Sequence, residues 1–289
     1  MEGKNNIRIR AGLDRFARFI FLLATLFALT MLGLLLYRVF SEGISFLSWD
    51  FLTSPLSTDP ERAGILGAIL GTLWLMAVVT PVTLIIGIST AIYLEWYAPN
   101  NRWTKLIQMN IANLAGVPSI VYGLLGLTVF VRFMNLGNVV LAGGLTMSLL
   151  ILPIVIVASQ EALRAVPNDL AEAAYGMGAT KWQTMREVIL PVALPSMMTG
   201  AILALSRAIG ETAPLVAIGI PALLIPYPGS IFDKFTVLPM QIYYWTLDSS
   251  LTAEYANLAA ATIIVLLLLL LLLNGAAIYI RNKFSQPSN

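Results

Sequence analysis

The chain has 289 residues, of which 58% are hydrophobic and only 11% carry a charge. Soluble domains hold roughly 45 to 50% apolar and about 25% charged residues, so this composition excludes an ordinary water-soluble globule and indicates a polytopic membrane protein. The net charge of +2, without a basic cluster interleaved with aromatic residues, argues against a nucleic-acid partner.

The sequence contains no cysteine and no histidine. The chain therefore cannot form disulfides, Cys/His metal sites or a nucleophile paired with a histidine base. Most enzyme classes are disfavoured, and we expect a protein that is not an enzyme and that binds no metal.

About 20 predominantly apolar residues are needed to cross a bilayer as a helix. Six stretches of the sequence are long enough. They cover residues 19–37, 63–94, 106–131, 133–160, 188–232 and 255–280. The first is longer than the roughly 7 to 15 residues of a signal-peptide core, so we interpret it as a retained anchor. The fifth is predicted to be a helix followed by an outer loop.

Most of the 17 Lys and Arg residues fall in segments on the same side as the N-terminus. Because cytoplasmic segments of membrane proteins are enriched in these residues, both ends are predicted to be cytoplasmic. The expected fold is all-α with six transmembrane helices. It divides into an N-terminal part with the first span and an outer loop (1–62), a transmembrane domain (63–283) with a cytoplasmic loop (161–191), and a short tail (284–289).

The two outer segments, about 41–62 and 221–254, are expected to be ordered caps. They contain aromatic residues suited to a membrane interface, namely Trp49, Tyr227, Tyr243, Tyr244 and Trp245. These residues either anchor helix ends or frame a docking surface. Within the spans, kinks are expected at prolines, and Gly67 and Gly71 form a GxxxG pair that allows close approach; the prolines are Pro81, Pro118, Pro153 and Pro214.

The cytoplasmic loop is patterned as two short helices. Asp169 and Glu172 have capping-box spacing and begin an amphipathic helix, which the glycines at 176 and 178 end. Thr180 and Gln183 give a second capping box before another helix. Composition alone is also compatible with an interfacial helix lying on the inner leaflet.

The sequence of this loop resembles the EAA loop of ABC importer permeases, which has the pattern Glu-Ala-Ala, three residues, Gly, nine residues, then Ile-x-Leu-Pro. The matching residues are Glu172, Ala173, Ala174, Gly178, Leu190 and Pro191, and Val188 replaces the isoleucine of the pattern. The resemblance implies that the loop docks on an ATPase subunit and couples it to transport. The chain has no GxxxxGK[ST] loop, so no cofactor is expected on this chain and ATP with Mg²⁺ is expected on the partner.

Two charges interrupt the fifth span. Arg207 and Glu211 are four residues apart, so their side chains can pair. A charged residue at a membrane helix centre costs roughly 2.5 to 3.5 kcal/mol, and such residues commonly mark a substrate path. The pair is therefore either structural or part of an anion path, in which the arginine holds oxyanion oxygens and the glutamate holds the arginine when the path is empty. Arg132, at the outer end of the third span, is either a second positive station or a residue at the interface.

Two further motifs resemble the PstA family of phosphate ABC importer permeases. They are Gly116-Val-Pro-Ser-Ile-Val-Tyr-Gly123 and Arg207-Ala-Ile-Gly-Glu-Thr-Ala-Pro-Leu215. The resemblance covers roughly residues 63–280. It implies a type I ABC importer permease in a bacterial inner membrane, paired with a second permease similar to PstC. Two ATPase subunits similar to PstB and an extracytoplasmic phosphate-binding protein similar to PstS are the other implied partners.

The function expected from these features is that of half of a heterodimeric phosphate pore with alternating access. A permease for phosphonate, sulfate or molybdate is the closest alternative, because one arginine does not distinguish tetrahedral oxyanions. An ATP-independent secondary transporter or channel is less favoured, since no inverted repeat is seen.

Overall fold

The computed structural model describes residues 2–221 and 227–284. Within these ranges the chain is helical and has no strand beyond an isolated bridge between Val139 and Lys234. The α-helices are α1 (Glu2–Gly43), α2 (Trp49–Thr53), α3 (Leu66–Ile92), α4 (Arg102–Leu114), α5 (Ser119–Gly126), α6 (Val140–Arg164), α7 (Asn168–Gly176), α8 (Lys181–Gln183), α9 (Leu190–Gly210), α10 (Ala213–Ile218), α11 (Leu238–Asp248) and α12 (Glu254–Phe284). Two 3₁₀ turns, η1 (Ile44–Phe46) and η2 (Pro60–Arg62), and three π-helical segments, η3 (Tyr93–Tyr97), η4 (Leu127–Phe133) and η5 (Thr184–Ile189), complete the order.

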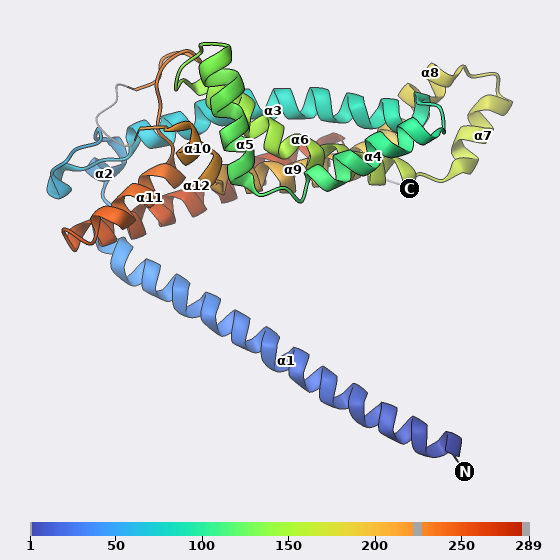
Figure 1. Cartoon of the computed structure of the whole chain (residues 1–289), viewed down its shortest axis with the longest axis horizontal. Helices are drawn as coiled ribbons and strands as arrows, with labels where there is room; N and C mark the ends of the chain where they lie inside the picture. Colours follow the sequence, from blue (N-terminus) through green and yellow to red (C-terminus); the bar gives the residue numbers. More distant parts are fainter. Residues whose placement is uncertain (1, 222–226, 285–289) are drawn as a thin grey trace.

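The long helices form an elongated bundle with distinct ends (Figure 1). The outer caps with α2 and α11 lie at one end, and α7 and α8 lie at the other. α1 ends beside α12 at the outer end of the bundle, whereas its N-terminal part lies away from the bundle, so most of its apolar side chains from Leu13 onward are exposed (Figure 1). Five helices are long and apolar enough to cross a membrane, and a bent pair makes a sixth crossing if it counts as one span.

The third predicted span, 106–131, is not one continuous helix. α4 and α5 meet at an angle of 102° across a break at residues 115–118. Proline disfavours helical backbone at the residue before it, so Pro118 begins a new helix instead of kinking an existing one. The Tyr122 hydroxyl donates to the Leu114 carbonyl at 2.8 Å and so satisfies one helix-end acceptor across the break.

The fourth span was predicted to begin at residue 133, but α6 begins at Val140. The intervening residues form a turn in which Asn135 (φ 54°) and Gly137 (φ 74°) have left-handed backbone. Asparagine and glycine adopt this conformation most readily, and it cannot continue a right-handed helix. The other predicted spans coincide with α1, α3, α9 and α12.

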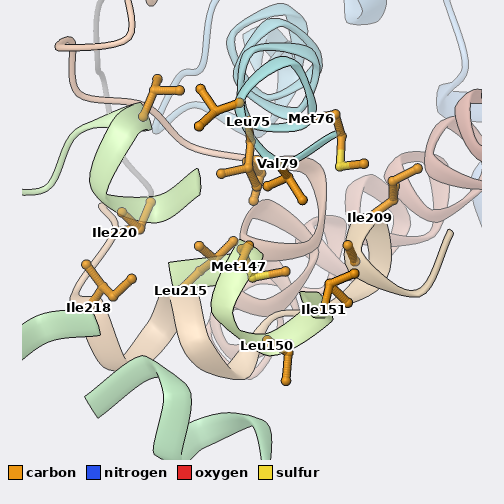
Figure 2. Packing of buried hydrophobic residues seen from close by; sticks show 14 of the residues in the cluster. Leu75, Met76, Val79, Met147, Leu150, Ile151, Ile209, Leu215, Ile218 and Ile220 are labelled. Carbon is orange, nitrogen blue, oxygen red and sulfur yellow. The ribbon is translucent and has the colours of Figure 1, made fainter. Parts of the chain in front are cut away.

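The main core lies where α3, α6 and α10 meet (Figure 2). Val79, Met147 and Leu215 come from these three helices and are almost fully buried together. The α3 side chains have a helical period and meet the opposed face of α6, which accounts for the extensive packing of this pair.

The predicted GxxxG pair does allow close approach, although its partner is the outer segment and not another span. Gly67 lies against Tyr227, and Gly71 lies against the Thr236 carbonyl. Next to it, the Thr72 hydroxyl accepts a hydrogen bond from the Leu238 amide at 3.0 Å. The outer segment is therefore held directly on α3.

The outer caps are ordered over their described residues 41–62 and 227–254, whereas residues 222–226 of the second predicted cap lie outside the described ranges; the aromatic residues differ in role. Trp49 is 77% exposed and suits an interface. Trp245 was also predicted to lie at the interface, but it is only 3% exposed and packs near Phe51 with ring centroids 6.2 Å apart. The reason is that α11 lies against α12, which places this tryptophan in a secondary core.

Candidate functional site

The intramembrane charges lie at a break in the fifth span. α9 ends at Gly210, Glu211 has extended backbone (φ −75°, ψ 128°), and the short helix α10 begins two residues later with Pro214 in its first turn. Arg207 occupies the last turn of α9, where the negative end of the helix dipole favours a cation. The break and the charges thus coincide.

Arg207 and Glu211 form the predicted ion pair, with Nε 3.1 Å from Oε1. The arginine side chain is 53% exposed and that of the glutamate 17%. Among the described residues, this Nε contact is the one hydrogen bond of the guanidinium, so both terminal amino groups remain available for a ligand. The predicted ion pair is therefore present. Its geometry agrees both with a structural pair and with a place in an anion path.

A polar contact fixes the turn that carries Arg207. Ser206 donates to the Ile202 carbonyl and lies 2.5 Å from the amide oxygen of Asn274 on α12. Sequence analysis missed Asn274, although a polar residue directly after the leucine run 266–273 was a usable signal. The contact joins α9 to α12 just beside the charged pair.

The two motifs that resemble PstA proteins are brought together in space. α5, which carries the end of the first motif, packs against α10, which carries the end of the second. A Cβ atom on Gly123 would lie 2.7 Å from both the Cα and the carbonyl oxygen of Pro214, which real Cβ atoms essentially never show. The glycine is therefore needed for this approach, and each of the two broken spans supports the other.

Arg132 lies in the last turn of η4, and its side chain is exposed. Within the described ranges, no hydrogen bond or ion pair connects it to Arg207. Its assignment to a substrate path remains a prediction.

The cytoplasmic loop forms a helix, a turn and a second helix, as predicted. α7 begins at Asn168 after Pro167, and no side chain caps it, so the prediction that Asp169 is a cap is wrong. Proline fixes its own backbone and ends the preceding segment, which starts the helix one residue early and places Asp169 in the first turn. There its charge still suits the helix dipole.

Most of α7 faces solvent. Ala171 is its buried residue, whereas Glu172 and Ala173 are exposed and Ala174 is half-buried. Met177 lies on the apolar face of the predicted amphipathic helix, here called the apolar stripe, and is 89% exposed. The apolar stripe is thus left uncovered by this chain.

The turn after α7 and the helix beyond it also follow the sequence pattern. Gly178 has φ +83° and nothing within 4 Å of its Cβ position. Thr180 and Gln183 form the predicted capping box. The second helix is not a separate element as predicted, however, because residues 181–210 run as one helix through η5 into α9.

Leu190 and Pro191 begin α9 within this long helix, with Leu190 half-buried and Pro191 exposed. Proline has no backbone N–H to donate. The hydrogen-bond pattern of the preceding π-helical segment is wider than that of an α-helix, so the helix can continue without this donor. Residues 181–210 therefore form one helix that begins at the cytoplasmic loop and reaches Arg207.

The broken spans, the intramembrane charges and the exposed loop define a membrane transport component. The chain belongs to the family described as binding-protein-dependent transport system inner membrane component, which matches residues 83–286. It is therefore a multi-pass inner-membrane protein, and its relatives are permease subunits, not enzymes.

More particular likenesses come from individual proteins. The probable ABC transporter permease protein YqgI of Bacillus subtilis is 34% identical over 195 residues, covering 68% of this chain and 66% of that protein. The phosphate transport system permease protein PstA 1 of Mycobacterium tuberculosis is 35% identical over 191 residues, covering 64% and 60%. The chain thus spans slightly less than two thirds of the length of these relatives.

The fold has solved counterparts. A structure of the MetNI methionine ABC transporter in an inward-facing conformation matches with a TM-score of 0.62 at 19% identity, covering 77% of this chain and 96% of that chain. This likeness confirms the all-α importer-permease fold that the sequence predicted.

Proposed function

We propose that the chain is the permease subunit of an ATP-driven importer of inorganic phosphate and forms half of a heterodimeric, alternating-access pore. The observation that carries the proposal is the half-exposed Arg207 guanidinium at the break of α9, with both terminal amino groups free of partners within the described residues. The name of the mycobacterial relative supports phosphate as the substrate.

The chemistry of Arg207 suits a phosphate that must be bound and then released. A guanidinium donates two parallel hydrogen bonds to an oxyanion and keeps its charge at every physiological pH. Glu211 competes for the same guanidinium, so the arginine has a partner when no anion is present. Such competition keeps the anion from being trapped in a region of low dielectric.

A second permease subunit is proposed because large surfaces of this chain lack a partner. The Arg207 side chain is 53% exposed, and α1 exposes apolar side chains such as Phe21 (70%) and Phe27 (66%). Lipid can cover α1, but half of a charged path has to be closed by protein or water. A subunit similar to PstC would supply that wall.

Two ATPase subunits similar to PstB would supply the energy, one of them docked on this chain. The surface for docking is α7 with its uncovered stripe around Met177 and the open side of Gly178. ATP and Mg²⁺ would be held by the ATPase. Its closure would push α7 and, through the continuous helix 181–210, turn the break that carries Arg207.

A phosphate-binding protein similar to PstS would deliver the anion at the outer caps, which α2 and α11 keep ordered. The exposed Trp49 and Tyr243 lie in these caps and are suited to a protein contact.

The experiment is reconstitution of the chain with its neighbouring permease and ATPase in vesicles that enclose ATP-regenerating medium. ATP-dependent uptake of phosphate, competed by phosphate more than by sulfate, molybdate or phosphonate, is expected. Stronger competition by another oxyanion would assign the pore to that anion. Uptake without any ATPase would replace the proposal with secondary transport.

A further inference from the structure

A pocket of about 460 Å³ lies beneath the coupling loop, which we define as residues 165–180. Residues from four segments line it: the inner ends of α3 and α6, then α7, and the helix that follows. Glu95, Arg164 and Lys181 bring charge to its wall. Apolar packing surrounds this space, because Ala91 and Leu94 share a buried cluster with Ala171 of α7, and the charged groups lie on the wall of the open volume.

An ion pair crosses one side of this pocket. Arg164, the last residue of α6, has its Nε 3.0 Å from an oxygen of Glu95 and a terminal nitrogen 3.1 Å from an oxygen of Glu161. Glu95 is 22% exposed and belongs to η3, whereas Glu161 is 66% exposed and lies one turn back on the same helix. Of the ion pairs among the described residues, the contact with Glu95 is the one that joins separate elements.

A second contact joins Lys181, which lines the pocket, to η3. The Lys181 ammonium lies 5.1 Å from the centroid of the Tyr97 ring, within the range of a cation–π interaction. Glu95 and Tyr97 both lie in η3, the π-helical segment that continues α3. Short π-helical segments are rare and are frequently found at functional sites.

α9 and α3 differ in how they are connected to the coupling loop. α9 receives movement directly, because residues 181–210 form one helix. α3 has no chain connection to the loop and packs along α6, and packed helices can slide past each other. A charge-assisted hydrogen bond is directional, unlike apolar contact, so it can fix the axial position of one helix relative to the other.

We propose that the Glu95–Arg164 ion pair is a positioning device that makes α3 follow the coupling loop when the ATPase moves it. The inference rests on the proposed function, since it requires an ATPase on α7. Glu95 and Arg164 touch neither substrate nor nucleotide. They act by keeping the inner ends of α3 and α6 together, so that both walls of the path move in one step.

The first test measures the number of anions imported per ATP hydrolysed by the reconstituted complex. Glu95→Gln removes the charge but keeps the size of the side chain. ATP hydrolysis is expected to continue while transport per ATP falls about 2- to 30-fold, the range expected for mutations that weaken coupling by 0.5 to 2 kcal/mol. Glu161→Gln is the matched control and should leave the ratio unchanged.

Charge exchange makes the test specific. The double variant Glu95→Arg, Arg164→Glu reverses the pair and should recover most of the ratio lost in either single variant. A role of either residue outside the pair does not predict recovery, and the ratio of transport to ATP hydrolysis, measured on assembled complex, distinguishes loss of coupling from loss of assembly. An unchanged ratio in Glu95→Gln, or no recovery on exchange, overturns the proposal.

A distance measurement separates this inference from the identity of the substrate. The chain has no cysteine, so Ile85→Cys on α3 and Ala165→Cys at the start of the coupling loop, outside the proposed docking surface, can carry spin labels, and both positions are exposed. Nucleotide binding to the complex should leave the label distance unchanged when the pair is intact and change it when Glu95→Gln is added. If nucleotide binding affects the label distance equally with and without the ion pair, the proposal that the pair makes α3 follow the loop is overturned. Import of another oxyanion would overturn only the phosphate assignment.

Discussion

Replacing Arg207 with Gln removes the guanidinium and keeps a side chain that can donate a hydrogen bond. Because Arg207 is 53% exposed, its ion pair with Glu211 contributes only about 0 to 1 kcal/mol to stability, and the protein should still assemble. A hydrogen bond from a charged donor contributes about 1.5 to 3 kcal/mol. Its loss at the anion path should lower uptake roughly 10- to 150-fold at low phosphate.

The assay is the initial rate of ATP-dependent phosphate uptake in vesicles, normalised to the amount of assembled complex. Glu211→Gln keeps the guanidinium and removes its internal competitor, so it should retain phosphate binding and slow phosphate release, an effect distinct from that of Arg207→Gln. The double variant Arg207→Gln, Glu211→Gln removes the unpaired carboxylate and tests whether any loss comes from that charge alone. Uptake within about threefold of the unaltered protein in Arg207→Gln would refute the role of Arg207 in the path.

Three other substitutions test the loop and the broken spans. Gly178→Arg should leave the protein in the membrane and ATP hydrolysis intact but lower phosphate uptake at least about tenfold, because the new side chain fills the docking face. Gly176→Ala is also in open space but lacks a positive φ, and it should be neutral in the same assay. Gly123→Ala should lower the free energy of unfolding in detergent by about 1 to 3 kcal/mol, because the added methyl group overpacks against α10. In Gly116→Ala the Cβ atom would be 3.5 Å from its nearest neighbour, so an equal effect of that substitution would contradict this reason. Thr180→Ala should cost about 0.5 to 2 kcal/mol of local helix stability and speed amide exchange at residues 181–184, and unchanged exchange there would contradict the capping role.

The positions of the spans and of the coupling loop could be predicted from sequence because both depend on local patterns. An uncharged stretch of sufficient length has few alternatives to a membrane helix, since a bilayer satisfies no backbone polar group. The capping box at Thr180 and the left-handed turn at Gly178 are likewise set by neighbouring residues. Local signals were weaker at Pro167, whose effect on the helix start outweighed the capping spacing of Asp169.

The four-residue spacing also predicted the Arg207–Glu211 pair, although Glu211 follows the end of α9 and has extended backbone. The sequence alone could not determine that the chain breaks between Gly210 and Ala213, that Gly123 meets Pro214, or that Arg164 reaches Glu95. These are contacts between residues far apart in the chain, and they depend on how whole helices are placed. Apolar periodicity says which face of a helix is buried but not against which neighbour, so only the tertiary structure decided which charges and glycines meet.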